Sequence, residues 1–533
     1  MDGSQLKARP AGHVLAEALI AAGATHAWCV PGESYLGLLD GLRDQPGFRI
    51  VTARHEGGAG FMALTHARLT GQPGLLMISR GPGMGNAMIA AHVAEQDGVP
   101  LILLIGQVPR DVRNRGAFQE VDYSRTFSDI AKEVIEINDP RRVAEFAAQA
   151  WRLAVAGRPG PVVLSLPEDM LLVDVATPVI SVPLPARAQP TSEALRAIAE
   201  ALAAAERPLL LAGEALASQE GRAALLDCAV AWGVPVLCGH KHQDLFPNRH
   251  PAWAGHIGHV VPEAQSQAWA EADLIIAAGS LLGDVDTQGY IFPHFPMAAQ
   301  SLIQIHHDPV ALARHYCPEL AVCADATETL TALARLAVDR IGISPDWTLR
   351  LHRLTLPVAQ DDAYAAVLLA LDGQAAENAI FAMDSGRFAS AAHRLIAYGG
   401  KRQLLGTASG AMGNGVPAAV AAAVLDPGRQ VIAIVGDGGL LMTGNELATA
   451  LREDVPIRIL VANNAAYGAI AGHQDRLFPG RRHSMELANP DFQAWAAAFG
   501  ALGLKVTRAE EAAETVQRFL NHPGSAVLEV LCD

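Results

Sequence analysis

Gly436-Asp437-Gly438-Gly439 follows the apolar run Val431-Ile432-Ala433-Ile434-Val435, and this junction decides the fold. The run is typical of a strand buried on both faces, so the four residues form the turn at its carboxyl end. Ligands bind at that edge of an open α/β sheet. Glycines there let backbone N–H groups approach an anion such as a phosphate. The stretch therefore predicts a parallel sheet with an anion site at its carboxyl edge.

Asp437 adds a carboxylate to the same edge. A carboxylate and a phosphate repel each other unless a divalent cation lies between them, and Mg²⁺ is the expected ion because it prefers oxygen ligands. The next strand, predicted over Ile457 to Ala462, ends at Asn463-Asn464. The spacing from Asp437 to Asn464 suits the return of one βαβ unit. An amide oxygen and a loop carbonyl would then complete the metal shell.

The G-D-G and N-N motifs at this separation resemble the diphosphate-binding motif of thiamine diphosphate (ThDP) enzymes. The resemblance implies metal ligands at Asp437, Asn464 and the carbonyl of Ala466. Either motif alone is usually a turn or a loop, so the assignment depends on finding both. The alternative for Arg387, in the loop after the strand that ends at Met383, is an ordinary surface charge. The implied cofactor-binding residues in this block and in the loop Asp384-Ser385-Gly386-Arg387 are Gly386, Arg387, Gly436, Asp437, Gly438, Gly439, Asn464, Tyr467 and Gly468.

Glu56, in Arg54-His55-Glu56-Gly57-Gly58, stands where these enzymes place a catalytic glutamate. The resemblance implies that its carboxylate hydrogen-bonds N1′ of the aminopyrimidine, so that N4′ can remove the proton from the thiazolium C2. The alternative is a glutamate placed at a helix N-terminus because the helix dipole favours it.

The segment Thr407-Ala408-Ser409-Gly410-Ala411-Met412 resembles the part of these enzymes that bends the cofactor into a V shape. The resemblance implies that Met412 is the wedge beneath the cofactor and that the Gly410 carbonyl accepts a hydrogen bond from N4′. A methionine at such a position is otherwise more often core filler.

Strand-like runs alternate with helix-like segments along most of the chain, which favours the α/β class with parallel sheets. A proline-rich connector is predicted at about 177–190, and the pattern lapses around 341–358. The first and third parts have a similar rhythm, which indicates duplicated sheets. The resemblance to ThDP enzymes implies three doubly wound parallel-sheet domains: a pyrimidine-binding domain at 1–178, a central domain at 190–340 and a diphosphate-binding domain at 360–533.

The acetolactate synthases give the closest local similarity, carried by Ser79 to Gly83, Ala117 to Glu120, Asn445 to Ala450 and Asn489 to Phe492. The resemblance implies a carboligase that joins two pyruvates into 2-acetolactate with release of CO₂. Gln119 would line its pocket, and His473 is a candidate proton handler. A loop glutamine is ordinarily just solvated, and a lone histidine is more often structural.

Several stretches depart from the synthases. Gly279 to Asp286 lacks their substrate-contacting arginine, and His473 replaces a tryptophan. Glu33 and Arg80 bring charge to loops that face the cofactor, where they either select a polar substrate or pair with each other. Ala212-Gly213-Glu214-Ala215 replaces the glycine cluster used for FAD, so FAD binding is not expected.

The departures keep open a ThDP-dependent 2-oxo acid decarboxylase or aldehyde lyase, and a non-catalytic regulator with the same fold. A dinucleotide-dependent dehydrogenase is disfavoured because no G-x-G-x-x-G fingerprint follows a strand with an acidic residue about 20 positions later. The intact set Glu56, Asp437 and Asn464 argues against the regulator.

Composition limits the partners. The chain has 533 residues, with 40 Lys and Arg against 55 Asp and Glu, a net charge of −15, which disfavours nucleic acid. No apolar run has membrane-spanning length, and six scattered cysteines without a C-x-x-C pair are typical of reduced thiols in a cytoplasmic protein. Small 2-oxo acids or aldehydes are the expected substrates. The resemblance implies a homodimer or homotetramer, with active sites between one subunit's pyrimidine domain and another's diphosphate domain.

Overall fold

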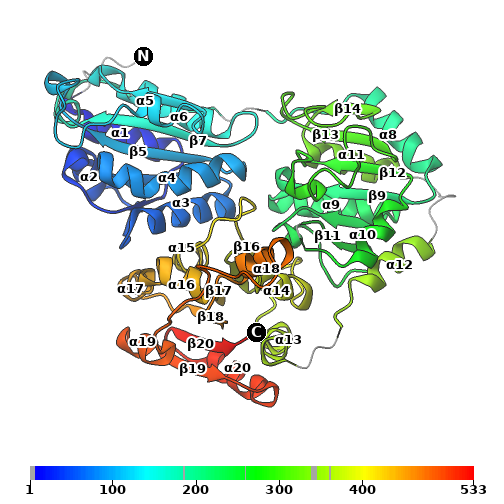
Figure 1. Ribbon diagram of the computed structural model, residues 1–533. Helices are drawn as coiled ribbons and strands as arrows, with labels where there is room; N and C mark the ends of the chain where they lie inside the picture. The colour runs from blue at the N-terminus through cyan, green and yellow to red at the C-terminus, as the bar shows by residue number, and fades with distance from the viewer. Residues whose placement is uncertain (1–6, 184–185, 259, 338–344, 359–361, 533) are drawn as a thin grey trace.

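The computed structural model describes residues 7–183, 186–258, 260–337, 345–358 and 362–532. Within these residues the chain forms three six-stranded parallel sheets and one short antiparallel pair, β1 (Arg9–Pro10) with β8 (Asp174–Val175). Figure 1 shows the three sheet units as distinct parts of the molecule, coloured blue to cyan, green, and yellow to red along the chain. The prediction of three doubly wound α/β domains is confirmed.

The first unit has the strand order β3-β2-β4-β5-β7-β6. Its strands are β2 (His26–Cys29), β3 (Arg49–Thr52), β4 (Gly74–Ile78), β5 (Leu101–Gln107), β6 (Glu133–Glu136) and β7 (Pro161–Pro167). Its helices are α1 (Ala11–Ala21), α2 (Leu36–Arg43), α3 (Glu56–Thr70), α4 (Gly81–Gln96), α5 (Tyr123–Thr126), α6 (Val143–Val155) and α7 (Glu168–Leu171).

The third unit repeats that topology, with the order β16-β15-β17-β18-β20-β19. Its strands are β15 (Ile380–Met383), β16 (Gln403–Leu405), β17 (Val431–Gly436), β18 (Arg458–Asn463), β19 (Leu502–Val506) and β20 (Ala526–Leu531). Its helices are α13 (Ala363–Gln374), α14 (Ala389–Leu395), α15 (Gly415–Leu425), α16 (Asp437–Thr443), α17 (Leu447–Arg452), α18 (Gly468–Leu477), α19 (Phe492–Ala498) and α20 (Ala512–Asn521). The shared strand order agrees with the predicted duplication.

The middle unit has a different order, β11-β10-β9-β12-β13-β14. Its strands are β9 (Pro208–Ala212), β10 (Val236–Cys238), β11 (Trp253–His256), β12 (Leu274–Ala278), β13 (Ser301–His306) and β14 (Leu320–Cys323). Its helices are α8 (Ser192–Ala204), α9 (Gln219–Trp232), α10 (Glu263–Ala270), α11 (Ala326–Leu336) and α12 (Pro345–Leu354). This is the strand order of dinucleotide-binding sheets, in which the direction of winding reverses between the first and fourth strands in sequence.

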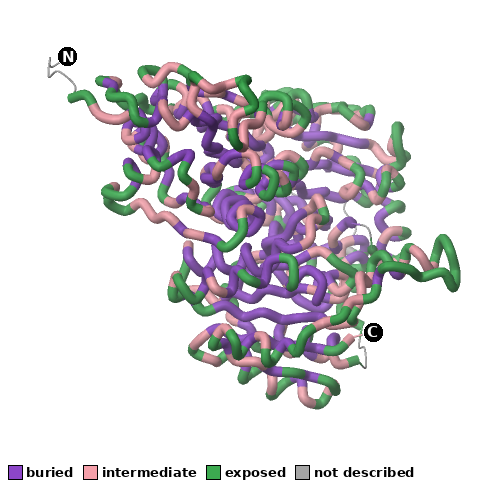
Figure 2. The backbone as a smooth tube through the Cα atoms, turned by 60° about the vertical axis from the view of Figure 1, so that its left-hand side comes forward, coloured by how far each residue is buried: buried purple, intermediate pink, exposed green. Residues whose placement is uncertain are grey.

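One hydrophobic core joins the first and third units. Helix α3 packs against α15, and their buried side chains belong to a single cluster that reaches both sheets. Residues 415–424 of α15 are buried all round, as expected for a helix without a polar face. Figure 2 shows the buried backbone continuing from the first unit into the third. The two units are therefore fixed relative to each other by apolar burial.

The sequence expectations differ from the structure at two places. Helix α12 forms within the stretch where the pattern was expected to lapse, and its Trp347 and Leu351 are buried against the middle sheet. The predicted turn at Gly436 to Gly439 is tighter than expected, because β17 extends to Gly436 and α16 begins at Asp437. The six cysteines, all within the described residues, form no disulfide.

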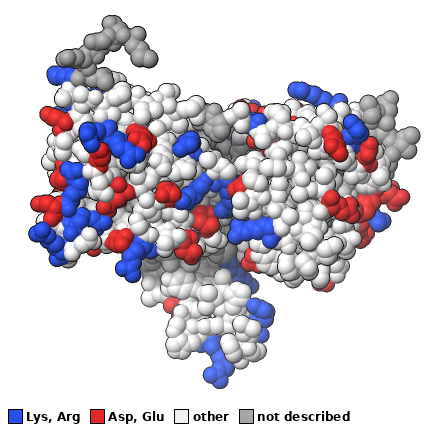
Figure 3. Space-filling view, turned by 90° about the horizontal axis from the view of Figure 1, so that it is seen from above, with Lys and Arg blue, Asp and Glu red and all other residues white. Residues whose placement is uncertain are grey.

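The charged side chains show no large region of one sign on the face seen in Figure 3, where Lys and Arg alternate with Asp and Glu. Among the described residues, no helix is both long enough and apolar enough to span a bilayer.

Candidate active site

Two loops meet where the third sheet reverses its direction of winding. β15 and β17 are neighbours in parallel register, and Asp384 and Asp437 directly follow their carboxyl ends. This is the topological switch point, where open α/β sheets bind ligands. Asp437 is 2% exposed, and its Oδ2 accepts a hydrogen bond of 2.7 Å from Asn489 Nδ2. The same amide donates to Asn463 Oδ1 at 2.9 Å, so it ties the end of β17 to the end of β18.

Glycine is required at Gly438 and Gly439 because their neighbours leave no room for a side chain. A Cβ at Gly438 would lie 2.8 Å from the Tyr467 ring, and one at Gly439 would lie 2.5 Å from Asp384 Oδ2. Tyr467 belongs to the loop after β18, and its N–H donates to the Met485 carbonyl at 2.8 Å. The two glycines thus bring the loops after β15, β17 and β18 together.

Asn464 lies at the rim of this crevice, where its Oδ1 accepts a hydrogen bond of 3.2 Å from the Ala466 N–H. Gly468 begins α18, and a Cβ there would lie 2.8 Å from Asn464 Nδ2 and 3.7 Å from the Arg387 Cβ. Gly386 and Gly436 both face the Phe388 ring. The structure therefore gathers the predicted diphosphate residues from three loops, those after β15, β17 and β18, into one crevice.

The crevice contains buried polar atoms that lack partners. Ser385 Oγ and Asn489 Oδ1 have no hydrogen-bond partner in the structure. Such atoms are rare in native proteins and indicate a polar ligand or ordered water. The described residues hold no cluster of three or more His, Cys, Asp or Glu that could bind a metal. A magnesium ion here would therefore need amide, carbonyl and phosphate oxygens beside the single carboxylate of Asp437, which is a donor set typical of Mg²⁺.

Glu56 is the first residue of α3, directly after the N-cap His55, whose Nδ1 accepts from the Gly57 N–H at 3.0 Å. It is half-buried, and its Oε2 accepts a hydrogen bond of 2.9 Å from Asn86 Nδ2 on α4. A Cβ at Gly83 would lie 3.3 Å from its other oxygen, so the start of α4 lies alongside. In the described part of this single chain, no hydrogen bond or ion pair joins Glu56 to Asp437 or Asn464.

Glu446 was not singled out from the sequence, but it connects the third unit to the Glu56 helix. It ends a short 3₁₀ turn (Gly444–Glu446), and its carboxylate accepts from the backbone N–H groups of Arg54 and His55 at 3.1 Å each. Thr449 Oγ1 donates to it at 2.6 Å, and burial raises the pKa of Glu446 above its usual value. The partners lie almost 400 residues apart, so no local pattern could indicate them.

Gly410 and Met412 lie in the segment between β16 and α15. Gly410 has φ = 76° with open space around it, so its left-handed backbone requires glycine. Met412 is half-buried. The Gly413 N–H donates to both carboxylate oxygens of Asp384, at 2.9 and 3.1 Å. The segment thus ends directly at the crevice that contains Asp437.

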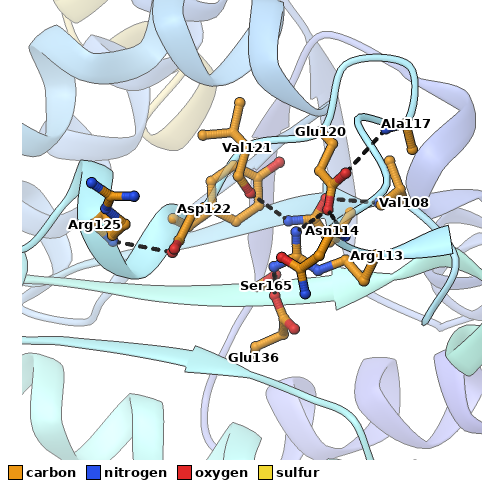
Figure 4. Close-up of polar contacts among 12 residues, drawn as sticks. Val108, Arg113, Asn114, Ala117, Glu120, Val121, Asp122, Arg125, Glu136 and Ser165 are labelled. Atoms are coloured by element: carbon orange, nitrogen blue, oxygen red, sulfur yellow. Dashed lines mark hydrogen bonds and ion pairs between the residues drawn. The ribbon is translucent and has the colours of Figure 1, made fainter. Parts of the chain in front are cut away.

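Gln119 lies in a loop that Glu120 holds in place (Figure 4). The Glu120 carboxylate accepts from the backbone N–H groups of Asn114 (2.6 Å) and Ala117 (3.1 Å) and from Arg113 (2.9 Å). Arg113 also pairs with Glu136 at 2.6 Å, which anchors the loop to β6. Gln119 itself has φ = 64°, and its carbonyl accepts from the Gly81 N–H at the start of α4. Glu120 therefore fixes an otherwise irregular backbone.

Glu120→Ala should loosen this loop, because two backbone N–H groups and the Arg113 guanidinium lose their acceptor. We expect trypsin to cut after Arg113 or Arg115 about tenfold faster, as loss of charge-assisted hydrogen bonds allows. Glu145→Ala is the matched control, since it removes a surface ion pair with Arg142 in the same unit. Equal cleavage rates in the wild type and Glu120→Ala would show that the carboxylate does not hold the loop.

Arg80, Glu33 and Glu168 form a charged cluster at the carboxyl edge of the first sheet. Arg80 is buried and pairs with Glu168 at 2.5 Å and with Glu33 at 3.4 Å. Of the two possibilities left open for Glu33 and Arg80, the structure therefore shows that they pair with each other. His473 lies exposed on α18, where Arg476 approaches its Nδ1 at 3.2 Å, and within the described residues no hydrogen bond or ion pair joins it to Glu56 or Gln119.

Comparison with known proteins agrees with this geometry. Sequence models described as the N-terminal TPP binding domain, the central domain and the C-terminal TPP binding domain of thiamine pyrophosphate enzymes match residues 9–126, 195–333 and 384–530. An acetolactate synthase of Mycobacterium bovis is 30% identical over 513 residues, covering 92% of this chain and 82% of that protein. The chain belongs to the thiamine pyrophosphate enzyme family.

Two further relatives of this thiamine pyrophosphate enzyme cover nearly its whole length. The large subunit of acetolactate synthase isozyme 1 of Escherichia coli K12 is 28% identical over 525 residues, which is 95% of this chain and 90% of that subunit. The acetolactate synthase large subunit of Porphyra purpurea is 27% identical over 538 residues, 97% of this chain and 90% of that subunit. The resemblance to the acetolactate synthase group is thus confirmed, and the matched N-terminal and C-terminal TPP binding domains support binding of thiamine pyrophosphate, which is the same molecule as ThDP.

The switch point of the middle domain of this thiamine pyrophosphate enzyme lies between β9 and β12, which is where a dinucleotide binds in sheets of this strand order. A Cβ at Gly213 would lie 2.3 Å from the Ser280 Cα, so only glycine fits between these two backbone segments. Glu214 and Asp286 bring two carboxylates to the same edge, and burial raises the pKa of both. These groups repel a pyrophosphate whenever they are ionised, so the absence of FAD stays a prediction.

Glu214 should make the stability of this thiamine pyrophosphate enzyme fall as pH rises. Burial, reinforced by the nearby Asp286 carboxylate, raises its pKa to about 7 from an ordinary value of 4.5. The folded state therefore holds a proton that the unfolded chain releases, and its stabilisation is complete below about pH 4.5 and lost as pH rises through about 7. The wild type should lose about 3 kcal/mol of unfolding free energy between these limits, and Glu214→Gln should remove that loss.

The measurement for Glu214 is the thermal unfolding midpoint of the apoprotein from pH 5 to 8, for the wild type and Glu214→Gln in parallel. Glu220→Gln serves as control, because it removes an exposed carboxylate near the same edge. Parallel pH curves for the wild type and Glu214→Gln would contradict the assignment.

Proposed function

We propose that this protein is a ThDP- and Mg²⁺-dependent carboligase that acts on 2-oxo acids and joins two pyruvates into 2-acetolactate with loss of CO₂. The observation that carries the proposal is the crevice at the switch point of the third sheet, where Asp437, Asn464 and the glycine loop lie beside orphaned polar atoms. The named activity of the M. bovis and E. coli relatives, which align with nearly the whole chain, supports the choice of reaction.

The residues have distinct proposed tasks. Asp437, Asn464 and the Ala466 carbonyl bind Mg²⁺, while Gly386, Arg387, Gly436 and the glycines after it hold the diphosphate. Tyr467 and Gly468 close that loop beneath it. ThDP itself supplies a carbon nucleophile and an electron sink for removing the carboxylate of a 2-oxo acid.

Glu56 is proposed to hold a proton at N1′ of the aminopyrimidine, and Asn86 orients its carboxylate for that task. The Gly410 carbonyl accepts from N4′, and Met412 supports the bent cofactor from below. Gln119 and His473 are proposed to face the substrate, where His473 handles a proton.

We further propose a homodimer whose active sites lie between subunits. Leu441 and Met442 on α16 are 47% and 48% exposed, and Phe118 beside Gln119 is 74% exposed. A subunit interface at this edge would bury these three apolar side chains. In such a dimer Glu56 of one subunit reaches the cofactor held by Asp437 of the other. On dilution, turnover should be lost together with the dimer, with the dimer measured by light scattering. Full activity in a monomeric fraction would contradict this arrangement.

A simple 2-oxo acid decarboxylase or aldehyde lyase is the second candidate. It is favoured by His473 in place of the synthases' tryptophan and by the charged cluster of Arg80, Glu33 and Glu168. This cluster carries a net negative charge when all three groups are ionised, so it disfavours a second 2-oxo acid as acceptor.

One experiment separates the candidates. Purified protein with ThDP, Mg²⁺ and pyruvate is assayed separately for acetolactate, acetaldehyde and CO₂, and then with a panel of 2-oxo acids and acyloins. Acetolactate as the main product supports the carboligase, whereas CO₂ with free aldehyde supports the second candidate. If the protein binds ThDP but consumes none of these compounds, the result supports the non-catalytic regulator. An absorbance spectrum of the purified protein tests for flavin.

A further inference from the structure

The segment Gly406–Met412, called the wedge loop below, has no regular secondary structure within the described residues. Its backbone polar groups therefore need partners outside a helix or sheet. Those partners come mainly from another domain, because two charged side chains of the first unit reach across to it.

Asp97 and Arg68 together grip the start of the wedge loop. The Asp97 carboxylate accepts from the Ala408 N–H at 3.0 Å and from the Ser409 N–H at 2.8 Å. Arg68 donates one guanidinium nitrogen to the Gly406 carbonyl and another to Asp97. The Asp97 side chain is 0% exposed and that of Arg68 is 18% exposed. The pair thus satisfies two donors and one acceptor of four consecutive residues.

The far end of the wedge loop is fixed within the third unit. Asp384 accepts from the Gly413 N–H, and Thr443 Oγ1 donates to the Gly413 carbonyl at 2.7 Å. Lys241 of the middle unit donates to the Asp384 carbonyl at 3.0 Å. With both ends fixed, the exposed Gly410 is the part of the loop that remains open to a ligand.

Arg68 and Asp97 lie at the carboxyl ends of α3 and α4, the helices whose first halves carry Glu56 and Asn86. Arg68 is in the last turn of α3, which starts at Glu56, and Asp97 follows α4, which carries Asn86. These helices pack so closely that a Cβ at Gly60 would lie 2.4 Å from the Ala90 Cβ. They form one rigid body between Glu56 and the wedge loop.

We propose that Arg68 and Asp97 are positioning residues that set the wedge loop for cofactor binding. The proposal rests on the proposed role of Gly410 and Met412. Without the pair, the N–H groups of Ala408 and Ser409 lose a charged acceptor, and the loop samples more conformations. Ordering the loop then reduces the free energy of ThDP binding. The pair touches neither the crevice at Asp437 nor Glu56, so it acts only through the loop.

Asp97→Asn tests the proposal, because asparagine keeps the size of the side chain but has one acceptor oxygen and no charge. In the apoprotein, amide hydrogen exchange measured on peptides covering 406–413 should become faster by about tenfold or more. The dissociation constant for ThDP, titrated calorimetrically at saturating Mg²⁺, should rise by a similar factor. Arg68→Lys keeps the positive charge beside Asp97 but cannot reach both partners at once, so it should show a smaller change in both measurements.

Glu95→Gln is the matched control, because it removes a carboxylate from the same end of α4 that makes no contact with the wedge loop. Wild-type exchange and ThDP affinity in folded Asp97→Asn would overturn the proposal, as would equal changes in Glu95→Gln. If Asp97→Asn does not fold, Arg68→Lys decides by the same two measurements. The exchange measurement needs no cofactor. Failure of the wild-type protein to bind ThDP would therefore overturn the proposed function, and hydrogen exchange would still test whether Arg68 and Asp97 hold the wedge loop.

Discussion

Glu56→Gln should reduce kcat by about 10²- to 10⁴-fold, the usual contribution of a positioned acid–base group. Glutamine can accept the hydrogen bond from Asn86 as glutamate does, so α3 and α4 should keep their packing. It cannot exchange a proton with N1′ of the aminopyrimidine, which is the task proposed for this residue. Steady-state turnover of 2-oxo acids and calorimetric titration with ThDP would measure the two effects separately.

ThDP affinity should change little in Glu56→Gln, because the diphosphate and the metal are bound at the third sheet. Glu133→Gln is a suitable control, since it removes an exposed carboxylate from β6 of the same unit. Turnover equal to that of the wild type would remove Glu56 from its proposed role. A large loss of ThDP affinity would instead indicate that Glu56 mainly anchors the cofactor.

Asp437→Ala should weaken ThDP binding on the order of 100-fold, because it removes the only carboxylate among the three proposed metal ligands. The side chain is buried and hydrogen-bonded to Asn489, so its loss also leaves an amide with one partner fewer. Raising the Mg²⁺ concentration should recover part of the affinity, because the metal and the diphosphate bind together. Titration with ThDP at several Mg²⁺ concentrations gives both quantities.

Asp426→Ala controls for loss of a carboxylate elsewhere in the third unit, because Asp426 is exposed and precedes the amino end of β17, whereas Asp437 follows its carboxyl end. Circular dichroism of the apoprotein verifies that each variant is folded. An unchanged ThDP titration in Asp437→Ala would contradict the metal assignment, whatever the activity of the variant.

Local sequence patterns determined much of the fold. Apolar runs such as those at β5, β9, β12 and β17 are buried on both faces, which is what marks central parallel strands. Edge strands such as β6 and β14 were missed, because they are short and their partly exposed residues weaken the apolar signal. Helix α12 was missed for the same reason, since only one side of it is buried.

Asp437, Asn464 and Glu56 became candidate functional residues through the resemblance of their motifs to those of ThDP enzymes. The sequence by itself determined that the chain folds as repeated α/β units. It did so because strand burial, glycine turns and carboxylates at strand ends are local properties that neighbouring residues reveal. Only the tertiary structure decided how the units are joined: Glu446 binds the backbone before Glu56, and Asp97 with Arg68 holds the wedge loop. It also decided that Asn489 binds Asp437 within the third unit. Most of these contacts join residues hundreds of positions apart, and a buried carboxylate can find many different N–H partners. Their choice depends on how apolar burial packs α3 against α15, which no local pattern encodes.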